Sequence, residues 1–285
     1  MKYEVRVLIE ADAEVGEGPV IDPRTGNLCW VDIPAGHLFQ SDLATGATER
    51  WDLGMSIGAL APRANHEGFG VAVAQGFGFG IDGELTVVDE VLPDADMRMN
   101  DAKCDPAGRL WAGSTEMDLT PGRGSLHRWD GRGPSTVMRT GLGLPNGLGW
   151  NAKGDVMYLA DSVTGLIMRT GFDVVRGEIG EFTPIAKVSQ GVPDGLAVDQ
   201  EGCLWVAIWG ASAVHRYSPI GRLIDTISMP VTQPSSCAFT SDGKLIVTSA
   251  RAGLRVAVLR QEPLAGSVFE MATQTEGVPI APFAT

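Results

Sequence analysis

The chain has few cysteines, little positive charge and no long apolar run, and each shortage argues against a class of protein. The formal net charge of -13 disfavours nucleic acid and anionic membranes as partners, because binding either depends on Lys and Arg. No segment approaches ~18 uninterrupted apolar residues, and residues 1–10 show no basic region followed by an apolar core. We therefore expect a soluble, cytoplasmic protein.

The few cysteines also show no metal-binding or redox spacing. They form no C-x-x-C pair and lie far apart within apolar stretches, so we expect buried free thiols. They are Cys29, Cys104, Cys203 and Cys237.

The chain also lacks any stretch with a sustained helical period, a cap and a stop, which disfavours βαβ architectures. It contains instead a recurring pattern, in which an apolar strand is followed by an acidic or Asn turn, a Gly and an apolar run rich in Trp or Tyr. Examples are VIDPRTGNLCWVD at residues 20–32, KCDPAGRLWAGS at 103–114 and WNAKGDVMYLAD at 150–161. Each turn is typical of a hairpin, because Gly supplies a positive φ and Asp or Asn bonds the local backbone.

The repeat spacing indicates the fold. The repeat glycines are Gly26, Gly68, Gly108, Gly154, Gly202 and Gly243, so that successive copies lie 42, 40, 46, 48 and 41 residues apart. A four-stranded propeller blade takes ~40 to 50 residues, and six such blades occupy almost the whole chain. The pattern predicts an all-β, six-bladed propeller forming one domain over residues 1–285, whereas a large β-sandwich would not repeat so regularly.

Closure of the ring has a candidate at the N-terminus. Residues 3–9 alternate between polar and apolar side chains, and the last repeat is short of an outer strand. We expect this N-terminal strand to complete the last blade, which removes an exposed edge.

Polar residues recur at one level of the repeat. The first strand of a blade lines the central channel, so equivalent positions form a ring around one mouth. Eight residues before each repeat glycine lie Gly18, Leu60, Asn100, Asn146, Asp194 and Ser235, and Glu17 adjoins the first of them. Two carboxylates and two carboxamides would therefore converge.

Such a ring calls for a cation, because crowded buried anions repel one another or take up a proton. Donors that are all oxygen suit Ca²⁺, Mg²⁺ or Mn²⁺ better than a structural zinc site. Taken singly, the words Asn-Gly and Asp-Gly are more simply interpreted as turns. Together, positions that differ in side chain yet stay polar favour an asymmetric site.

At these residues the sequence resembles the gluconolactonase, regucalcin and luciferin-regenerating enzyme family, formerly named for the senescence marker protein. The resemblance covers nearly the whole chain and rests on four motifs. They are GEGP at 16–19, MRMNDAK at 97–103 with the following DPAGRLWAG at 105–113, PNG at 145–147 and PDG at 193–195.

The resemblance implies a six-bladed propeller with one divalent metal, Ca²⁺, Mg²⁺, Mn²⁺ or Zn²⁺, that hydrolyses sugar lactones. Its motifs would make Glu17, Asn146 and Asp194 the metal ligands. They would make Arg98, Asn100 and Asp118 the substrate contacts.

The chemistry expected of these parts is metal polarisation of the lactone carbonyl while Asp194 takes a proton from the attacking water. Asp101 is an alternative base, and bonding to a neighbouring loop is an equally good interpretation of it. Two alternative functions remain: a non-catalytic calcium-binding or scaffold propeller, and an esterase or phosphotriesterase acting on another substrate.

Overall fold

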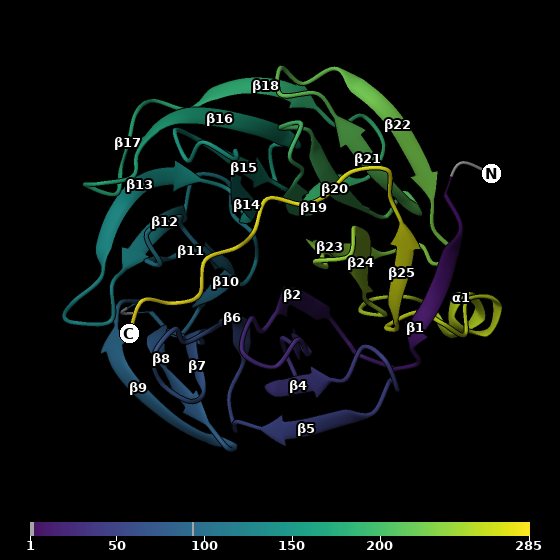
Figure 1. Ribbon diagram of the computed structural model, residues 1–285, viewed down its shortest axis with the longest axis horizontal. Helices are drawn as coiled ribbons and strands as arrows, with labels where there is room; N and C mark the ends of the chain where they lie inside the picture. Colours follow the sequence, from purple (N-terminus) through teal and green to yellow (C-terminus); the bar gives the residue numbers. More distant parts are fainter. Residues whose placement is uncertain (1–2, 93) are drawn as a thin grey trace.

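The computed structural model describes residues 3–92 and 94–285 and contains six antiparallel β-sheets arranged around one axis (Figure 1). The predicted six-bladed propeller is confirmed. All six repeat glycines have φ between 70° and 79°, in the left-handed region that the predicted hairpins require. The repeat spacing therefore marks one hairpin turn in each blade.

The strands of each blade are given from the innermost to the outermost. Blade 1 contains β2 (Gly16–Ile21), β3 (Leu28–Asp32), β4 (His37–Ser41) and β5 (Thr48–Asp52). Blade 2 contains β6 (Ile57–Pro62), β7 (Phe69–Val73), β8 (Gly76–Ile81) and β9 (Glu84–Glu90). Blade 3 contains β10 (Met97–Cys104), β11 (Leu110–Glu116), β12 (Gly124–Trp129) and β13 (Thr136–Leu142).

Blade 4 contains β14 (Pro145–Trp150), β15 (Val156–Asp161), β16 (Leu166–Asp173) and β18 (Thr183–Lys187). It departs from four strands through β17 (Glu178–Ile179), which pairs with the end of β16. Blade 5 contains β19 (Val192–Val198), β20 (Leu204–Trp209), β21 (Ala213–Tyr217) and β22 (Leu223–Ser228). Blade 6 contains β23 (Pro234–Phe239), β24 (Lys244–Ser249), β25 (Val268–Ala272) and β1 (Val5–Ile9).

The N-terminal strand closes the ring as expected. β1 pairs antiparallel with β25, with Val5 opposite Met271 and Val7 opposite Phe269. The last blade thereby combines three strands from the end of the chain with one from its beginning (Figure 1). This pairing removes the free edge of β25.

The hydrophobic core lies between neighbouring blades. Trp111 of blade 3 and Trp150 of blade 4 are both buried, with ring centroids 6.2 Å apart, and Leu148 and Met157 belong to the same cluster. The four cysteines are free and buried, as predicted. Among the described residues the helix α1 (Val256–Gln261) is short, and no helix is long and apolar enough to cross a membrane.

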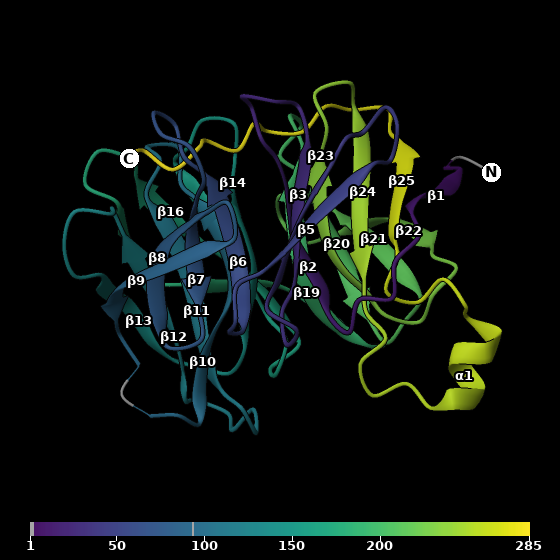
Figure 2. The ribbon, with the colours of Figure 1, turned by 90° about the horizontal axis from the view of Figure 1, so that it is seen from below.

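The C-terminal segment crosses one mouth of the channel. Val278 N–H donates to the carbonyl of Val198, the last residue of β19, and Phe283 N–H donates to the carbonyl of Pro62, the last residue of β6. Figure 2 shows this segment along one rim of the wheel and α1 beside the opposite rim. The mouth where the inner strands begin is therefore not the one that the tail covers.

Candidate functional site

The inner strands are irregular at the level of the predicted ring. In every blade the pairing of the two innermost strands shifts register near the start of the inner strand. Asn100, Asn146 and Asp194 lie within these shifts, and Glu17 lies at the start of one. A bulge bends its strand and re-aims a side chain, so the irregularity explains how these strands can turn polar groups toward the axis.

The glycines that follow two of these residues serve close packing. A Cβ added at Gly195 would lie 1.9 Å from Ser236 Oγ, and one at Gly147 would lie 2.4 Å from the backbone nitrogen of Leu196. Neither glycine has the left-handed φ that a tight turn would need. The interpretation of Asn-Gly and Asp-Gly as turn words is therefore wrong at these two positions, where the glycine lets adjacent inner strands approach each other.

Three carboxylates are buried together at this mouth, since Glu17, Asp101 and Asp194 are at most 5% exposed. Burial, followed by the charge of Asp101, raises the pKa of Glu17 to about 8. Burial, followed by the charges of Glu17 and Asp101, raises the pKa of Asp194 well above its usual range. The groups are close enough to disfavour one another's ionisation.

These carboxylates have few hydrogen-bond donors. Glu17 Oε2 accepts a bond of 2.8 Å from Gly18 N–H. Asp101 Oδ2 is buried and has no partner in the described part of the chain. An unpaired buried carboxylate oxygen is costly, which makes this oxygen available to a ligand or cation.

Two cationic side chains lie near the acids. Burial raises the pKa of all three acids, and the positive charges partly offset this rise, Arg98 for Asp194 and Lys103 for Glu17 and Asp101. Burial in turn lowers the pKa values of Arg98 and Lys103. Lys103 Nζ also donates to the carbonyl of Leu196, at 2.6 Å. The cluster thus joins three acids and two cations.

The two carboxamides are held by different partners. Asn100 Oδ1 accepts a bond of 2.5 Å from Arg98 Nη1, and its Nδ2 donates to the carbonyl of Pro145 at 3.1 Å. Asn146 Nδ2 donates to Ser162 Oγ at 3.1 Å. Because Asn146 uses its nitrogen in this bond, its Oδ1 remains available as an acceptor. The Oδ1 of Asn100 is instead bonded to Arg98.

The predicted substrate contact Asp118 does not join the buried cluster. It lies in the loop between β11 and β12, is exposed, and accepts bonds from the backbone nitrogen and hydroxyl of Thr120 at 3.0 and 2.8 Å. These bonds lower the pKa of Asp118. A role for Asp118 in substrate contact stays a prediction.

The donor set at the mouth fits a hard divalent cation. Its side chains offer carboxylate and carboxamide oxygens, and Asp101 Oδ2 has no partner among the described residues. The residues that could hold such a cation are Glu17, Asn146 and Asp194. They come from the inner strands of three blades.

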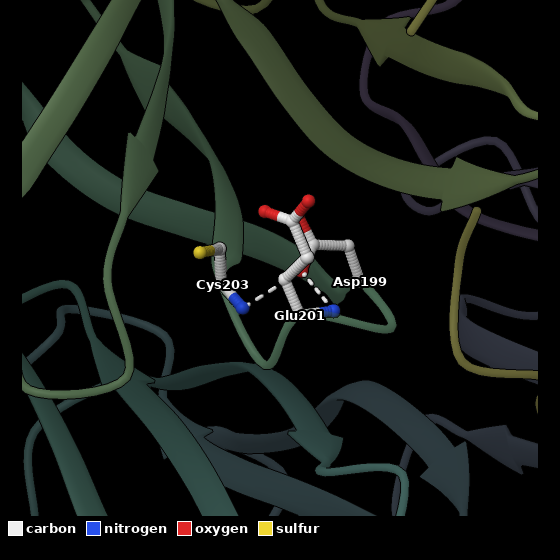
Figure 3. A group of neighbouring side chains, drawn as sticks. All are labelled: Asp199, Glu201 and Cys203. Carbon is white, nitrogen blue, oxygen red and sulfur yellow. Dashed lines mark hydrogen bonds between the residues drawn. The ribbon is translucent and has the colours of Figure 1, made fainter. Parts of the chain in front are cut away.

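A second acidic group lies on the hairpin between β19 and β20 (Figure 3). One ligand-type atom each from Asp199, Glu201 and Cys203 lie within 4.8 Å of one another. Asp199 Oδ2 already accepts from Trp205 Nε1 at 2.9 Å and from Arg216 Nη2 at 2.6 Å, and the same nitrogen donates to Glu201 at 2.6 Å. These bonds anchor the hairpin and neutralise its acids, so the group fits a cation less well.

Together the blades and the acid-rich mouth define a class, the six-bladed propellers with a polar site at one end of the axis. Residues 15–251 match the family model described as the SMP-30/Gluconolactonase/LRE-like region. The chain belongs to this family, as its motifs predicted.

Relatives match over nearly their full length. L-arabinolactonase of Azospirillum brasilense is 32% identical over 291 residues, covering 99% of this chain and 96% of the relative. Regucalcin of Danio rerio is 30% identical over 279 residues, covering 94% of each protein. The crystal structure of regucalcin from Agrobacterium tumefaciens, described as a calcium-binding protein, superposes with a TM-score of 0.94 at 28% identity, covering 99% of this chain and 98% of that one.

Sequence reasoning missed two polar residues of the mouth. Ser236 lies on the inner strand of blade 6 and partly offsets the rise that burial causes in the pKa of Glu17. Ser162 follows the last residue of β15 and bonds Asn146. A signal for Ser162 exists in the repeat, because the second strand of an antiparallel hairpin ends where the first begins.

Proposed function

We propose that this protein is a metal-dependent hydrolase that opens a sugar lactone to its hydroxy acid. The observation that carries the proposal is the group of three buried carboxylates at one mouth of the propeller, in which Asp101 Oδ2 has no partner among the described residues. The family supports it, since relatives over the whole length include a protein named L-arabinolactonase.

In this proposal Glu17, Asn146 and Asp194 hold one divalent cation. When bound, the cation supplies Lewis-acid polarisation of the lactone carbonyl and stabilises the negative charge that develops on its oxygen. Its identity among Ca²⁺, Mg²⁺, Mn²⁺ and Zn²⁺ follows from metal availability as well as from the oxygen donors.

The carboxylate of Asp194 accepts the proton of the attacking water. The water oxygen forms a bond to the carbonyl carbon, the bond from that carbon to the ring oxygen breaks, and the ring oxygen takes up a proton. Asp101 is the alternative base, because its Oδ2 lacks a partner among the described residues.

Arg98 and Asn100 orient the substrate. Arg98 is bonded to Asn100 Oδ1, so the two side chains form one polar unit beside the acids. The guanidinium group presents several N–H donors in a fixed geometry, which suits sugar hydroxyl and carbonyl oxygens. Asp118, on its exposed loop, would contact the substrate from outside.

A non-catalytic calcium-binding propeller is the second candidate, because a structural relative is described as a calcium-binding protein. Arg98 argues for catalysis, since a site that only binds a cation gains nothing from a second positive charge close to it. The two candidates differ in whether cation binding is accompanied by turnover.

The test measures acid release from a panel of sugar lactones by the chelator-treated protein, with Mg²⁺, Mn²⁺, Ca²⁺ or Zn²⁺ added singly. We expect at least one lactone to be hydrolysed only when a cation is present. Esters and phosphotriesters in the same assay test the other substrate classes. Cation binding without turnover of any substrate would support the calcium-binding candidate instead.

A further inference from the structure

The strands that carry the three candidate ligands are tied to neighbouring blades in the same way. In each case a side chain from the preceding blade donates a hydrogen bond to the backbone carbonyl just before the ligand. The bonds run from Ser235 Oγ to the carbonyl before Glu17, from Asn100 Nδ2 to the one before Asn146, and from Ser162 Oγ to the one before Asp194. The carbonyls belong to Gly16, Pro145 and Pro193.

Ser162 differs from the other two donors because it also contacts a ligand side chain. Its hydroxyl lies 2.6 Å from the carbonyl oxygen of Pro193 and accepts a bond of 3.1 Å from Asn146 Nδ2. Ser162 is 6% exposed and Asn146 is 5% exposed, so water competes little for either bond. One hydroxyl thereby connects a ligand of blade 4 with the strand of a ligand in blade 5.

The single proton of the Ser162 hydroxyl determines how the Asn146 carboxamide is oriented. A serine hydroxyl has one proton, and here the Pro193 carbonyl, which can only accept, takes it. The hydroxyl oxygen must therefore accept from Asn146, which places the NH₂ group on the Ser162 side. Asn146 Oδ1 then remains on the other side as a cation ligand.

We propose that Ser162 is a positioning residue that fixes the oxygen of Asn146 for cation binding and holds the strand of Asp194 in register with it. The assignment rests on the proposed function, in which Asn146 and Asp194 are ligands. Without the hydroxyl, the carboxamide of Asn146 is free to rotate and can turn its NH₂ group toward the cation. An NH₂ group of a carboxamide does not ligate a cation. Outer partners of metal ligands typically contribute 10–100-fold to metal affinity.

The test compares Ser162→Ala with Ser162→Thr and with a matched control, Ser41→Ala. Ser41 is also buried and hydrogen-bonded, to Trp30 and Thr48, but it lies at the end of β4 away from the site. Mn²⁺ binding is measured by calorimetry on chelator-treated protein whose fold is checked by thermal unfolding. We expect a Kd about 10–100-fold higher for Ser162→Ala, a Kd near that of the unsubstituted protein for Ser41→Ala, and recovery in Ser162→Thr. A Kd within twofold of the unsubstituted protein for Ser162→Ala overturns the proposal.

A second measurement separates this proposal from the proposed function. Proton exchange at the Asn146 side-chain amide is followed by NMR in the metal-free protein, where the Ser162 bond should slow exchange relative to Ser162→Ala. If the unsubstituted protein binds no cation, the proposed function fails, and the amide still reports whether Ser162 orients Asn146. Equal exchange in the two proteins would refute the orientation.

Discussion

The two mouths of the channel both hold buried acids, but their bonding differs. Asp22, Asp105 and Asp199 each follow the end of an inner strand and are fully buried. Asp105 accepts bonds from two backbone N–H groups, from Arg109 Nε at 2.7 Å and from Trp111 Nε1 at 3.0 Å. These acids have both carboxylate oxygens occupied, and each is paired with an arginine.

At the opposite mouth, the three buried acids of the cluster, Glu17, Asp101 and Asp194, have far fewer partners. Glu17 accepts from its neighbour Gly18, and one oxygen of Asp101 is unpaired within the described residues. Burial is therefore the same at both mouths and does not distinguish them. The pairing of the oxygens separates acids that hold hairpins together from acids that are available to a cation and substrate.

The largest effect that we expect comes from Asp194→Asn. The substitution keeps the size of the side chain and removes the base, so kcat for a lactone substrate should fall by about 10²–10⁴-fold. Steady-state kinetics at saturating metal measures the change, and circular dichroism checks the fold. Activity close to that of the unsubstituted protein would move the role of base to Asp101 and weaken the contrast between the mouths.

Phe283→Ala tests, through stability, the mouth that the C-terminal segment covers. The Phe283 ring is fully buried, and its centroid lies 5.0 Å from that of Trp129. Truncation should lower the free energy of unfolding by about 3–5 kcal/mol, measured by denaturant titration. Val175→Ala, at a side chain 86% exposed, is the control and should change it by less than about 0.5 kcal/mol. A large loss of kcat in folded Phe283→Ala would show that the two mouths are not independent.

Asp199→Asn tests the assignment of the hairpin acids. Loss of the charged bonds to Arg216 should lower the free energy of unfolding by about 2 kcal/mol, while kcat of the folded protein stays within twofold. Thermal unfolding and kinetics on the same sample measure both quantities. If metal-dependent turnover disappears while the fold is kept, the group of Asp199, Glu201 and Cys203 is the functional one.

The fold could be predicted from spacing because each repeat places one glycine at a turn with a left-handed φ. The same offset identified the level of Asn100, Asn146 and Asp194, because inner strands start at equivalent positions around a propeller axis. The pairing of β14 with β15 also places Ser162 at this mouth, but its role depends on a contact between blades 4 and 5 that no local pattern encodes. The role of Gly195 was also unreadable, since its close contact with Ser236 comes from another blade.

Asp101 is a buried acid with an unpaired oxygen, so its removal tests whether such an acid lowers stability. Within the cluster, three acids, Glu17, Asp101 and Asp194, outnumber two cations, Arg98 and Lys103, and burial raises the pKa of each acid, so their ionised forms disfavour one another. Asp101→Asn removes one of these acids, so we expect the metal-free protein to gain about 1 kcal/mol in unfolding free energy, measured by denaturant titration with chelator.

The same substitution should weaken divalent cation binding, measured by calorimetry, because the excess of acids attracts the cation. Asp105→Asn is the matched control, since an acid paired with arginine should lose stability on the same change. Loss of stability in metal-free Asp101→Asn would mean that Asp101 bonds a neighbouring loop as a structural acid. The difference between the mouths would then lie in Glu17 and Asp194 alone.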